Sequence, residues 1–191
     1  MFIRLTLRIL ATAAILALAA PHPSWAQASQ QSTGIQPGDA FGEDTILTPK
    51  SIVFVKGSGT WDNAFETITG AFKKLKAYTD KEGLKTDGLP MTIFTATDDT
   101  GFQYQAAIPI AETPKTPPRG EISIGQSPEG HALKFVHHGS YDQLDDTYEA
   151  ITNYLDDKRL EAKDMFIEQY VTDPVSANKD KLTVNVLVMV K

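Results

Sequence analysis

Cysteine is absent from all 191 residues of the chain. Disulfide bonds and thiolate nucleophiles are therefore excluded, and a zinc site would have to be built from histidine and carboxylate side chains. The sequence also lacks a G-x-S-x-G nucleophile motif and a phosphate-binding loop, which mark many hydrolases and nucleotide-dependent enzymes. No cofactor is predicted from the motifs that are present.

Lysine and arginine are outnumbered by acidic residues. They total 18 against 24 aspartates and glutamates, which gives a net charge of -6 at pH 7, and the folded part contains no run of basic residues. Nucleic-acid binding depends on clustered positive charge, so no nucleic-acid partner is expected. With 41% hydrophobic and 22% charged residues, the composition is that of a folded protein with one domain or two small ones.

The first 28 residues have the pattern of a secretory signal peptide. Arg4 and Arg8 precede an apolar stretch at 9–20, and small residues suited to cleavage follow. A membrane anchor is the alternative reading, but the stretch is shorter than the ~20 residues that span a bilayer, and two prolines follow it. We expect cleavage, a periplasmic or secreted location, and no stable membrane insertion afterwards.

The remainder divides into a leader and two halves. Residues 29–44 are polar and are predicted to be a flexible leader. Residues 45–111 form the first half, a proline-rich linker covers 112–120, and residues 121–191 form the second half. The first half is expected to contain a strand at 51–56, a helix with an apolar stripe at Phe65, Ile68, Phe72 and Leu75, and a hairpin of strands at 91–97 and 102–110.

In the second half, the segments 122–125 and 131–138 are predicted to pair as a hairpin, followed by a helix and two strands. The halves match at a spacing of 80 residues, at 59–62 with 139–142, Leu75 with Leu155, and 108–110 with 188–190. This repetition predicts an α+β fold of duplicated β-α-β-β units, with antiparallel sheets, one helix per half, and a central ligand groove between the halves.

The strand at 165–171 holds the main candidate site. Its side chains alternate between two faces, and we assign Met165, Ile167 and Val171 to the face covered by the helix. Glu168 and Tyr170 then share the face that points into the groove. An unpaired buried carboxylate is costly, so its place beside an aromatic ring indicates a binding site.

Three segments carry a resemblance to a known family. The sequences HHGSYDQL, TYEAITNYL and FIEQYVTDP, followed by an apolar last strand, resemble the GyrI-like domain, the effector-binding domain of AraC- and MerR-type regulators, over residues 45–191. The resemblance implies binding of small cationic or aromatic molecules, with a glutamate on a late strand as the anchor, and Glu168 stands at that place. Some members resemble hydrolases that open strained rings. No helix-turn-helix region accompanies the domain, and the predicted signal peptide would separate the protein from the chromosome and from gyrase, so neither transcription control nor gyrase inhibition is expected.

Seven residues are predicted to contact a ligand: Glu168, Tyr170, Tyr141, Trp61, Phe94, Tyr104 and His137. Each has an alternative role. Glu168 could be a surface carboxylate paired with Lys163 or Lys181, and the aromatic residues could simply pack in the core. Trp61 could cap its helix. No catalytic residue is assigned.

A metal site is not predicted, although His137 and His138 are adjacent. Neighbouring strand residues point to opposite faces, and no third ligand stands at a suitable spacing. Three functions are therefore considered. A small-molecule-binding module is the first, and a hydrolase of strained or electrophilic molecules that uses Glu168 as a general acid or base is the second. A protein that binds a partner through an exposed strand edge is the third.

Overall fold

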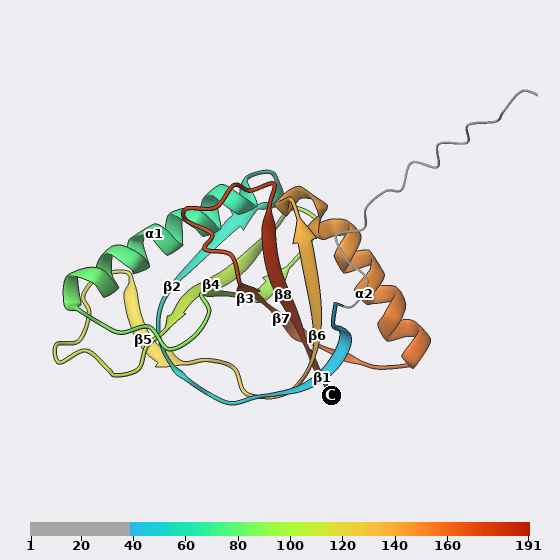
Figure 1. Cartoon of the computed structure of the whole chain (residues 1–191), viewed down its shortest axis with the longest axis horizontal. Coiled ribbons are helices and arrows are strands. Elements are labelled where there is room, and N and C mark those ends of the chain that lie inside the picture. Colours follow the sequence, from blue (N-terminus) through green and yellow to red (C-terminus); the bar gives the residue numbers. More distant parts are fainter. Residues whose placement is uncertain (1–38) are drawn as a thin grey trace, which may run out of the picture. The chain divides into compact units, whose positions relative to one another are not determined.

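The computed structural model describes residues 39–191, so the predicted signal peptide and most of the predicted leader lie outside the described residues. The described part is built on a single sheet of eight strands, all paired antiparallel, with two helices on one face (Figure 1). No helix in residues 39–191 has the length and apolar character needed to cross a membrane. The predicted α+β class is confirmed.

The elements follow one another in an order that occurs twice, strand–strand–helix–strand–strand. The strands lie side by side as β1-β6-β8-β7-β3-β4-β2-β5. The bounds are β1 Phe41–Leu47, β2 Ser51–Thr60, α1 Ala64–Glu82, β3 Met91–Thr97, β4 Gly101–Pro109, β5 Ile122–Gln126, β6 Gly130–Gly139, α2 Leu144–Lys158, β7 Ala162–Tyr170 and β8 Leu182–Val190, with short 3-10 turns at Trp61–Asn63 and Tyr141–Gln143 before the two helices. β1 begins inside the segment that was predicted to be a flexible leader.

The helices form where the sequence repeats apolar residues at helical spacing. In α1 the buried residues include Ile68, Phe72 and Leu75, which face the sheet. α1 ends at Gly83, which adopts a left-handed conformation at φ 64°, and the backbone N–H of Leu84 donates to the carbonyl of Thr79 at 2.9 Å. Just before α2, the Gln143 side-chain oxygen accepts a hydrogen bond from the Ser140 backbone at 3.2 Å.

The predicted hairpin between residues 122–125 and 131–138 is wrong. β5 pairs with β2, and β6 lies between β1 and β8. Each edge strand therefore completes the sheet of the other half, because β1 precedes β2 in the chain but lies beside β6. The two connections that cross the sheet are joined to each other, since Lys50 N donates to Ser127 Oγ at 2.9 Å and Ser127 N donates to the carbonyl of Lys50 at 2.8 Å.

The predicted alternation in β7 is correct, but the assignment of its faces is reversed. Tyr170 lies under α1, edge-on to Phe72 with 5.4 Å between ring centroids, so Glu168 and Tyr170 are on the helix-covered face. Ile167 belongs to a separate apolar cluster on the opposite face, with Met91 and Leu187. Alternation defines which residues share a face, but it carries no information about which face the helices cover.

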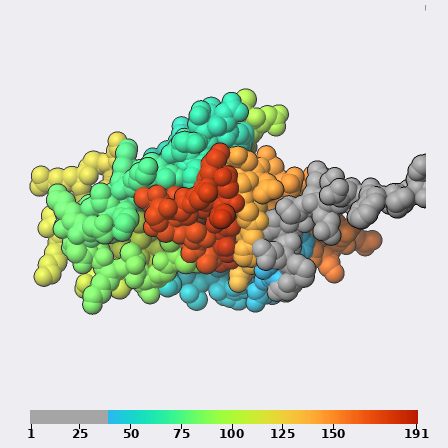
Figure 2. All heavy atoms as spheres, turned by 45° about the horizontal axis from the view of Figure 1, so that its top comes forward, coloured from blue at the N-terminus to red at the C-terminus, as the bar shows by residue number. Residues whose placement is uncertain are grey.

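The connection between β7 and β8 helps to cover the helix-bearing face. Its residues Val175 and Ala177 pack against the core cluster beneath the helices. Its Lys179 carbonyl accepts a hydrogen bond from the Tyr141 backbone N–H at 2.9 Å. Figure 2 shows this connection, coloured red, on the surface between α1 and the segment that leads into α2. The connection therefore covers the core between α1 and the start of α2.

Candidate functional site

A pocket of about 590 Å³ lies where the N-terminal ends of α1 and α2 meet above β7. This volume is within the range of roughly 300–1,000 Å³ that is usual for small-molecule sites. Both halves and both helix ends contribute side chains, and the lining residues are Trp61, Ala64, Thr97, Tyr141, Asp142, Leu144, Asp145, Tyr148, Phe166 and Glu168.

Glu168 is the buried charge of this pocket. Only 2% of the residue is exposed. Tyr148 on α2 donates a hydrogen bond to Oε1 at 2.8 Å, and Tyr170 on β7 donates one to Oε2 at 2.6 Å. Tyr141, which precedes α2, provides a third phenol beside the same carboxylate. These donors fix the carboxylate in place, but no cation among the described residues pairs with it.

Burial and hydrogen bonding act in opposite directions on this carboxylate. Burial raises the pKa of Glu168 from 4.5 to about 7, against the lowering effect of hydrogen bonds from Tyr170, Tyr148 and Tyr141. Burial and the nearby carboxylate also raise the pKa of each of these three tyrosines well above 10, so they remain donors. Near neutral pH the glutamate can therefore be ionised or protonated, and a cation in the pocket would favour the ionised form.

Aromatic rings form one wall. The Trp61 indole N–H donates to the Asp98 carbonyl at 2.7 Å, which fixes the ring, and its centroid lies 4.8 Å from that of Phe102. Phe94 stacks beneath Phe166, with centroids 4.5 Å apart and planes within 17°. Trp61 is 41% exposed, so an aromatic surface fixed by hydrogen bonding and stacking faces both the pocket and water.

The rim of the pocket is acidic. Asp142 pairs with Lys179, whose Nζ lies 3.3 Å from Oδ2, whereas Asp145 has no ion pair or hydrogen bond in the described part of the chain. No lysine or arginine lines the pocket within residues 39–191. The geometry combines carboxylates with aromatic faces, and both attract cations.

The family model for the GyrI-like small molecule binding domain matches residues 46–191. The chain belongs to this family. A comparison with curated protein sequences finds no match. The family match supports small-molecule binding and agrees with the order of motifs along the sequence.

Solved structures share the fold of this GyrI-like domain. EcmrR in its DNA complex has a TM-score of 0.66 and 12% sequence identity, and the match covers 78% of this chain and 56% of EcmrR. The separate EcmrR C-terminal domain has a TM-score of 0.61 and 13% identity, and the match covers 78% of this chain and 96% of that domain. A hydrolase from Listeria innocua has a TM-score of 0.55 and 13% identity, and the match covers 78% of this chain and 91% of the hydrolase. SAV2435 bound to tetraphenylphosphonium has a TM-score of 0.54 and 13% identity, and the match covers 78% of this chain and 93% of SAV2435. At these identities the comparison establishes the fold alone.

Of the residues predicted to contact a ligand, Glu168, Tyr141 and Trp61 line the pocket of the GyrI-like domain. Tyr170 and Phe94 do not line it and are each only 1% exposed, so they support Glu168 and the aromatic wall from behind. The alternative of a surface carboxylate does not fit Glu168, because the residue is buried.

Tyr104 and His137 lie outside the pocket. The Tyr104 ring packs on Phe102, with 5.6 Å between centroids, and lies against Gly57. His137 is fully buried, with Nδ1 2.8 Å from Thr147 Oγ1 and Nε2 3.0 Å from the Ser140 carbonyl. Burial lowers the pKa of His137, so the ring is neutral and donates from Nε2. It connects β6 to the start of α2.

Seven of the ten lining residues were not predicted, among them Tyr148, Phe166 and Asp145. Tyr148 stands on α2 at helical spacing from the buried residues Leu144 and Ile151, a position typical of a core residue. Its hydroxyl could have been matched with Glu168 only if β7 had been placed with that side chain towards the helices. The reversed faces therefore explain this omission.

Metal binding has no structural support in residues 39–191, where no group of three or more histidine, aspartate or glutamate side chains is arranged to hold an ion. His138 uses different partners from His137: its Nδ1 lies 3.0 Å from Thr183 Oγ1 and its Nε2 lies 3.1 Å from Asp39 Oδ1. The two rings therefore do not converge on a common point.

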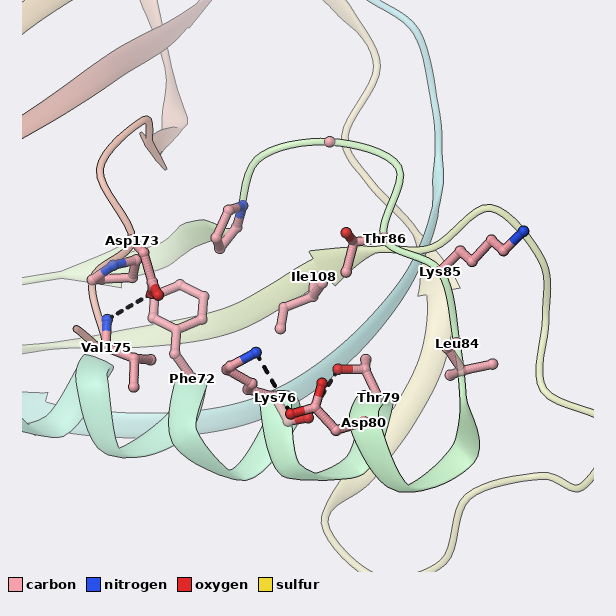
Figure 3. A pocket seen from close by; sticks show the side chains of 13 residues that line it. Phe72, Lys76, Thr79, Asp80, Leu84, Lys85, Thr86, Ile108, Asp173 and Val175 are labelled. Atoms are coloured by element: carbon pink, nitrogen blue, oxygen red, sulfur yellow. Dashed lines mark hydrogen bonds and ion pairs between the residues drawn. The ribbon is translucent and has the colours of Figure 1, made fainter. Parts of the chain in front are cut away.

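A second hollow, of about 610 Å³, lies beside the C-terminal half of α1 (Figure 3). Most of its charged groups have partners within the protein: Lys76 lies 3.5 Å from Asp80, and the Asp173 carboxylate accepts hydrogen bonds from the Val175 backbone and the Ser176 hydroxyl. The remaining one, Lys85, is exposed to solvent. No buried charge faces this hollow. The pocket at Glu168 is therefore the candidate functional site.

Proposed function

We propose that the protein is an exported small-molecule-binding protein, which holds a cationic, aromatic ligand between two pseudo-symmetric halves with Glu168 as the anionic anchor. One observation carries the proposal. The Glu168 carboxylate is buried on the inner wall of an open pocket, and no cation among residues 39–191 offsets its charge. Because a buried charge without a counterion is costly, a ligand cation would restore the missing partner.

The aromatic wall supports the same ligand class. A cation against a tryptophan or tyrosine face gains roughly 0.5–2 kcal/mol, and Trp61, Tyr141, Tyr148 and Phe166 supply such faces in this pocket. SAV2435, which shares the fold, binds tetraphenylphosphonium, a cation with aromatic substituents. This relative makes the same compound a suitable first probe. The DNA complex of EcmrR is a property of that protein, and the acidic charge of this chain argues against nucleic acid as its partner.

The export part of the proposal rests on the first 28 residues. Two arginines, an apolar stretch and small residues at the end fit a cleaved signal peptide. Intact-mass measurement of the protein recovered from the exported fraction tests this proposal. We expect a mass that lacks roughly the first 26–28 residues, and retention of the full chain in the cytoplasm would contradict it.

Calorimetric titration with tetraphenylphosphonium at pH 8 tests the anchor. Glu168→Gln should weaken binding at least about tenfold, because it removes the buried negative charge that lines the pocket. Glu149→Gln is the matched control: it lies on α2, is exposed and does not line the pocket, so it should bind like the wild type. Equal affinity of the wild type and Glu168→Gln would contradict the proposal, as would failure of the wild type to bind any aromatic cation in a panel.

A hydrolase is the second candidate, favoured by the pKa of about 7 at Glu168. A carboxyl group with this pKa can accept or donate a proton near neutral pH. A relative of the same fold is described as a hydrolase. Glu168 would take a proton from a water molecule while that water attacks a ring carbon of a strained, electrophilic substrate. The bond between this carbon and the ring heteroatom would break, and the proton would pass from Glu168 to the released heteroatom. Turnover of epoxides or aziridines should then disappear in Glu168→Gln, and an inactive wild type would remove this candidate.

A further inference from the structure

We propose that Asp145 provides a second anionic contact in the same pocket, so that the site prefers elongated ligands with two positive centres. This inference rests on the proposed cation-binding function and adds a specificity-determining residue to it. One positive centre would lie at the buried Glu168 carboxylate, and the other would lie in water at the pocket rim beside Asp145. The two carboxylates line one pocket but differ sharply in their surroundings.

The tyrosines relate the two carboxylates in space. Asp145 lies in the first turn of α2, three residues before Tyr148 and four residues after Tyr141. Residues at these spacings are neighbours on a helical surface. The Tyr148 side chain then extends from this turn to Glu168, where its hydroxyl donates to Oε1 at 2.8 Å. The Tyr148 side chain therefore connects the helical turn that carries Asp145 with the Glu168 carboxylate, and all three residues line the same pocket.

Electrostatic coupling supports this placement. The Asp145 charge contributes to the raised pKa of both Tyr141 and Tyr148, after the larger effects of burial and of Glu168. Asp145 is thus close to the side chains whose hydroxyls surround Glu168. A ligand in contact with these rings would reach both carboxylates.

Asp145 differs from the other acidic residues of its turn. Asp142 already has Lys179 as a partner at 3.3 Å. Asp146 is also exposed in the first turn of α2 but does not line the pocket. A carboxylate in the first turn is favourable to the helix dipole, and both Asp145 and Asp146 satisfy that requirement. Only Asp145 combines an unpaired charge with a position in the pocket lining.

The expected contribution of Asp145 is modest because the residue is exposed. Solvent-exposed ion pairs contribute about 0.2–1 kcal/mol, which corresponds to an affinity change of up to about fivefold. Salt screens such pairs, so the contribution should shrink as ionic strength rises. The buried Glu168 should keep most of its effect under the same conditions.

Decyltrimethylammonium and decamethonium form a suitable pair of probes, because they share a chain length and differ in carrying one or two quaternary ammonium groups. Each is titrated by calorimetry into the full protein and its Asp145→Asn, Asp146→Asn and Glu168→Gln variants, at low and high sodium chloride. We expect Asp145→Asn to weaken decamethonium binding by about two- to fivefold at low salt and to weaken decyltrimethylammonium binding by a smaller factor, because the single charge of that ligand lies at Glu168. Asp146→Asn removes the same charge from the same turn and should change neither affinity.

The outcomes separate the two proposals. Suppose that Glu168→Gln lowers the affinity for both ligands, whereas Asp145→Asn lowers both affinities equally or lowers neither. The proposed contact with Asp145 is then wrong, and the proposed contact with Glu168 is supported. The second contact is also wrong if Asp146→Asn reproduces the effect of Asp145→Asn, because a long-range charge effect would then suffice. If Glu168→Gln leaves both affinities unchanged, the cation-binding function itself fails.

Discussion

Burial leaves the Glu168 carboxyl with a pKa of about 7 in the folded protein, compared with 4.5 for an unperturbed glutamate. The folded state therefore holds this proton more tightly than the unfolded state does. By linkage, protonation of Glu168 contributes its full stabilisation to the folded state below pH 4.5, and this contribution is lost as the pH rises through 7. A shift of this size corresponds to a stability change on the order of 3 kcal/mol. The ionised Glu168 that a cation would bind therefore lowers the stability of the ligand-free folded protein.

The first prediction follows from this shift. The free energy of unfolding of the wild type, relative to Glu168→Gln, should decrease by a few kcal/mol between pH 4.5 and pH 8, because only the wild type must ionise a buried carboxyl. Urea unfolding of both proteins, without ligand, measures this difference across the pH range. Using the difference cancels titrations that the two proteins share, such as that of His137. A difference that does not vary with pH would show that Glu168 titrates normally.

The affinity for a cationic ligand should rise with pH, whereas the stability of the ligand-free protein should fall. A monovalent cation binds preferentially to ionised Glu168, so its affinity should rise with pH up to about 7 and level off above. Below pH 6 the loss should approach about tenfold per pH unit. Calorimetric titrations with tetraphenylphosphonium between pH 5 and pH 8.5 measure this profile. A flat profile in the wild type would contradict an ionised anchor, and Glu168→Gln provides the flat reference.

At the scale of the elements, the two helices end in the same conformation with different residues. Gly83 ends α1 at φ 64°, whereas Arg159 ends α2 at φ 55°. A left-handed conformation is strained for a residue with a Cβ atom and unstrained for glycine. The end of α2 is thus a place where local stability can be improved without touching the pocket at the other end of the helix.

Arg159→Gly should stabilise the protein by about 0.5–1 kcal/mol, after allowing for the greater freedom of glycine in the unfolded chain. Gly83→Ala is the converse change, and it should destabilise the protein by about 1 kcal/mol through backbone strain alone, since a Cβ there meets no neighbouring atom within 4 Å. Thermal and urea unfolding measure both effects. A stabilising Gly83→Ala substitution would contradict this account of the helix ends.

The sequence was informative where the physical signal is local. The stripe of Ile68, Phe72 and Leu75 identified α1, and alternation correctly placed Glu168 and Tyr170 on one face of β7. The sequence could not show which face the helices cover, because alternation is symmetrical between faces. Consequently the sequence pointed to Glu168, which does line the pocket, but not to Tyr148, which donates a hydrogen bond to it from α2.

The sequence also could not show which strands pair with each other when they lie far apart in the chain. β5 and β6 are separated by a short connection that would suit a hairpin, yet β5 pairs with β2. Both arrangements place the same side chains on alternating faces, so hydrophobic pattern does not distinguish them. The choice depends on which sheet edges are free in the complete fold, and that information is spread over the whole chain.

At the scale of the whole molecule, the exchanged edge strands connect the two halves. Phe41 on β1 packs edge-on against Phe135 on β6 and Tyr154 on α2, with centroid distances of 5.0 and 5.6 Å. The first strand of the chain is thereby held in the second half, although the next strand, β2, belongs to the first half.

Phe41→Ala should therefore destabilise the entire domain by about 2–3 kcal/mol, somewhat less than a fully buried phenylalanine would. Ile46→Ala on the same strand is the control, because Ile46 is 69% exposed, and it should change the free energy of unfolding by less than about 0.5 kcal/mol. Urea unfolding followed by far-ultraviolet circular dichroism measures both variants. A similar loss in the two would mean that β1 contributes through its backbone alone.

The tie between Lys50 and Ser127 has a consequence for how a ligand enters. Because the two crossing connections are hydrogen-bonded to each other and the eight strands form one continuous sheet, we do not expect the two halves to open by a hinge motion. Because the Trp61 ring is also held by Asp98 and Phe102, we expect a ligand to enter through the existing opening of the pocket, aided by small displacements of the first turn of α2.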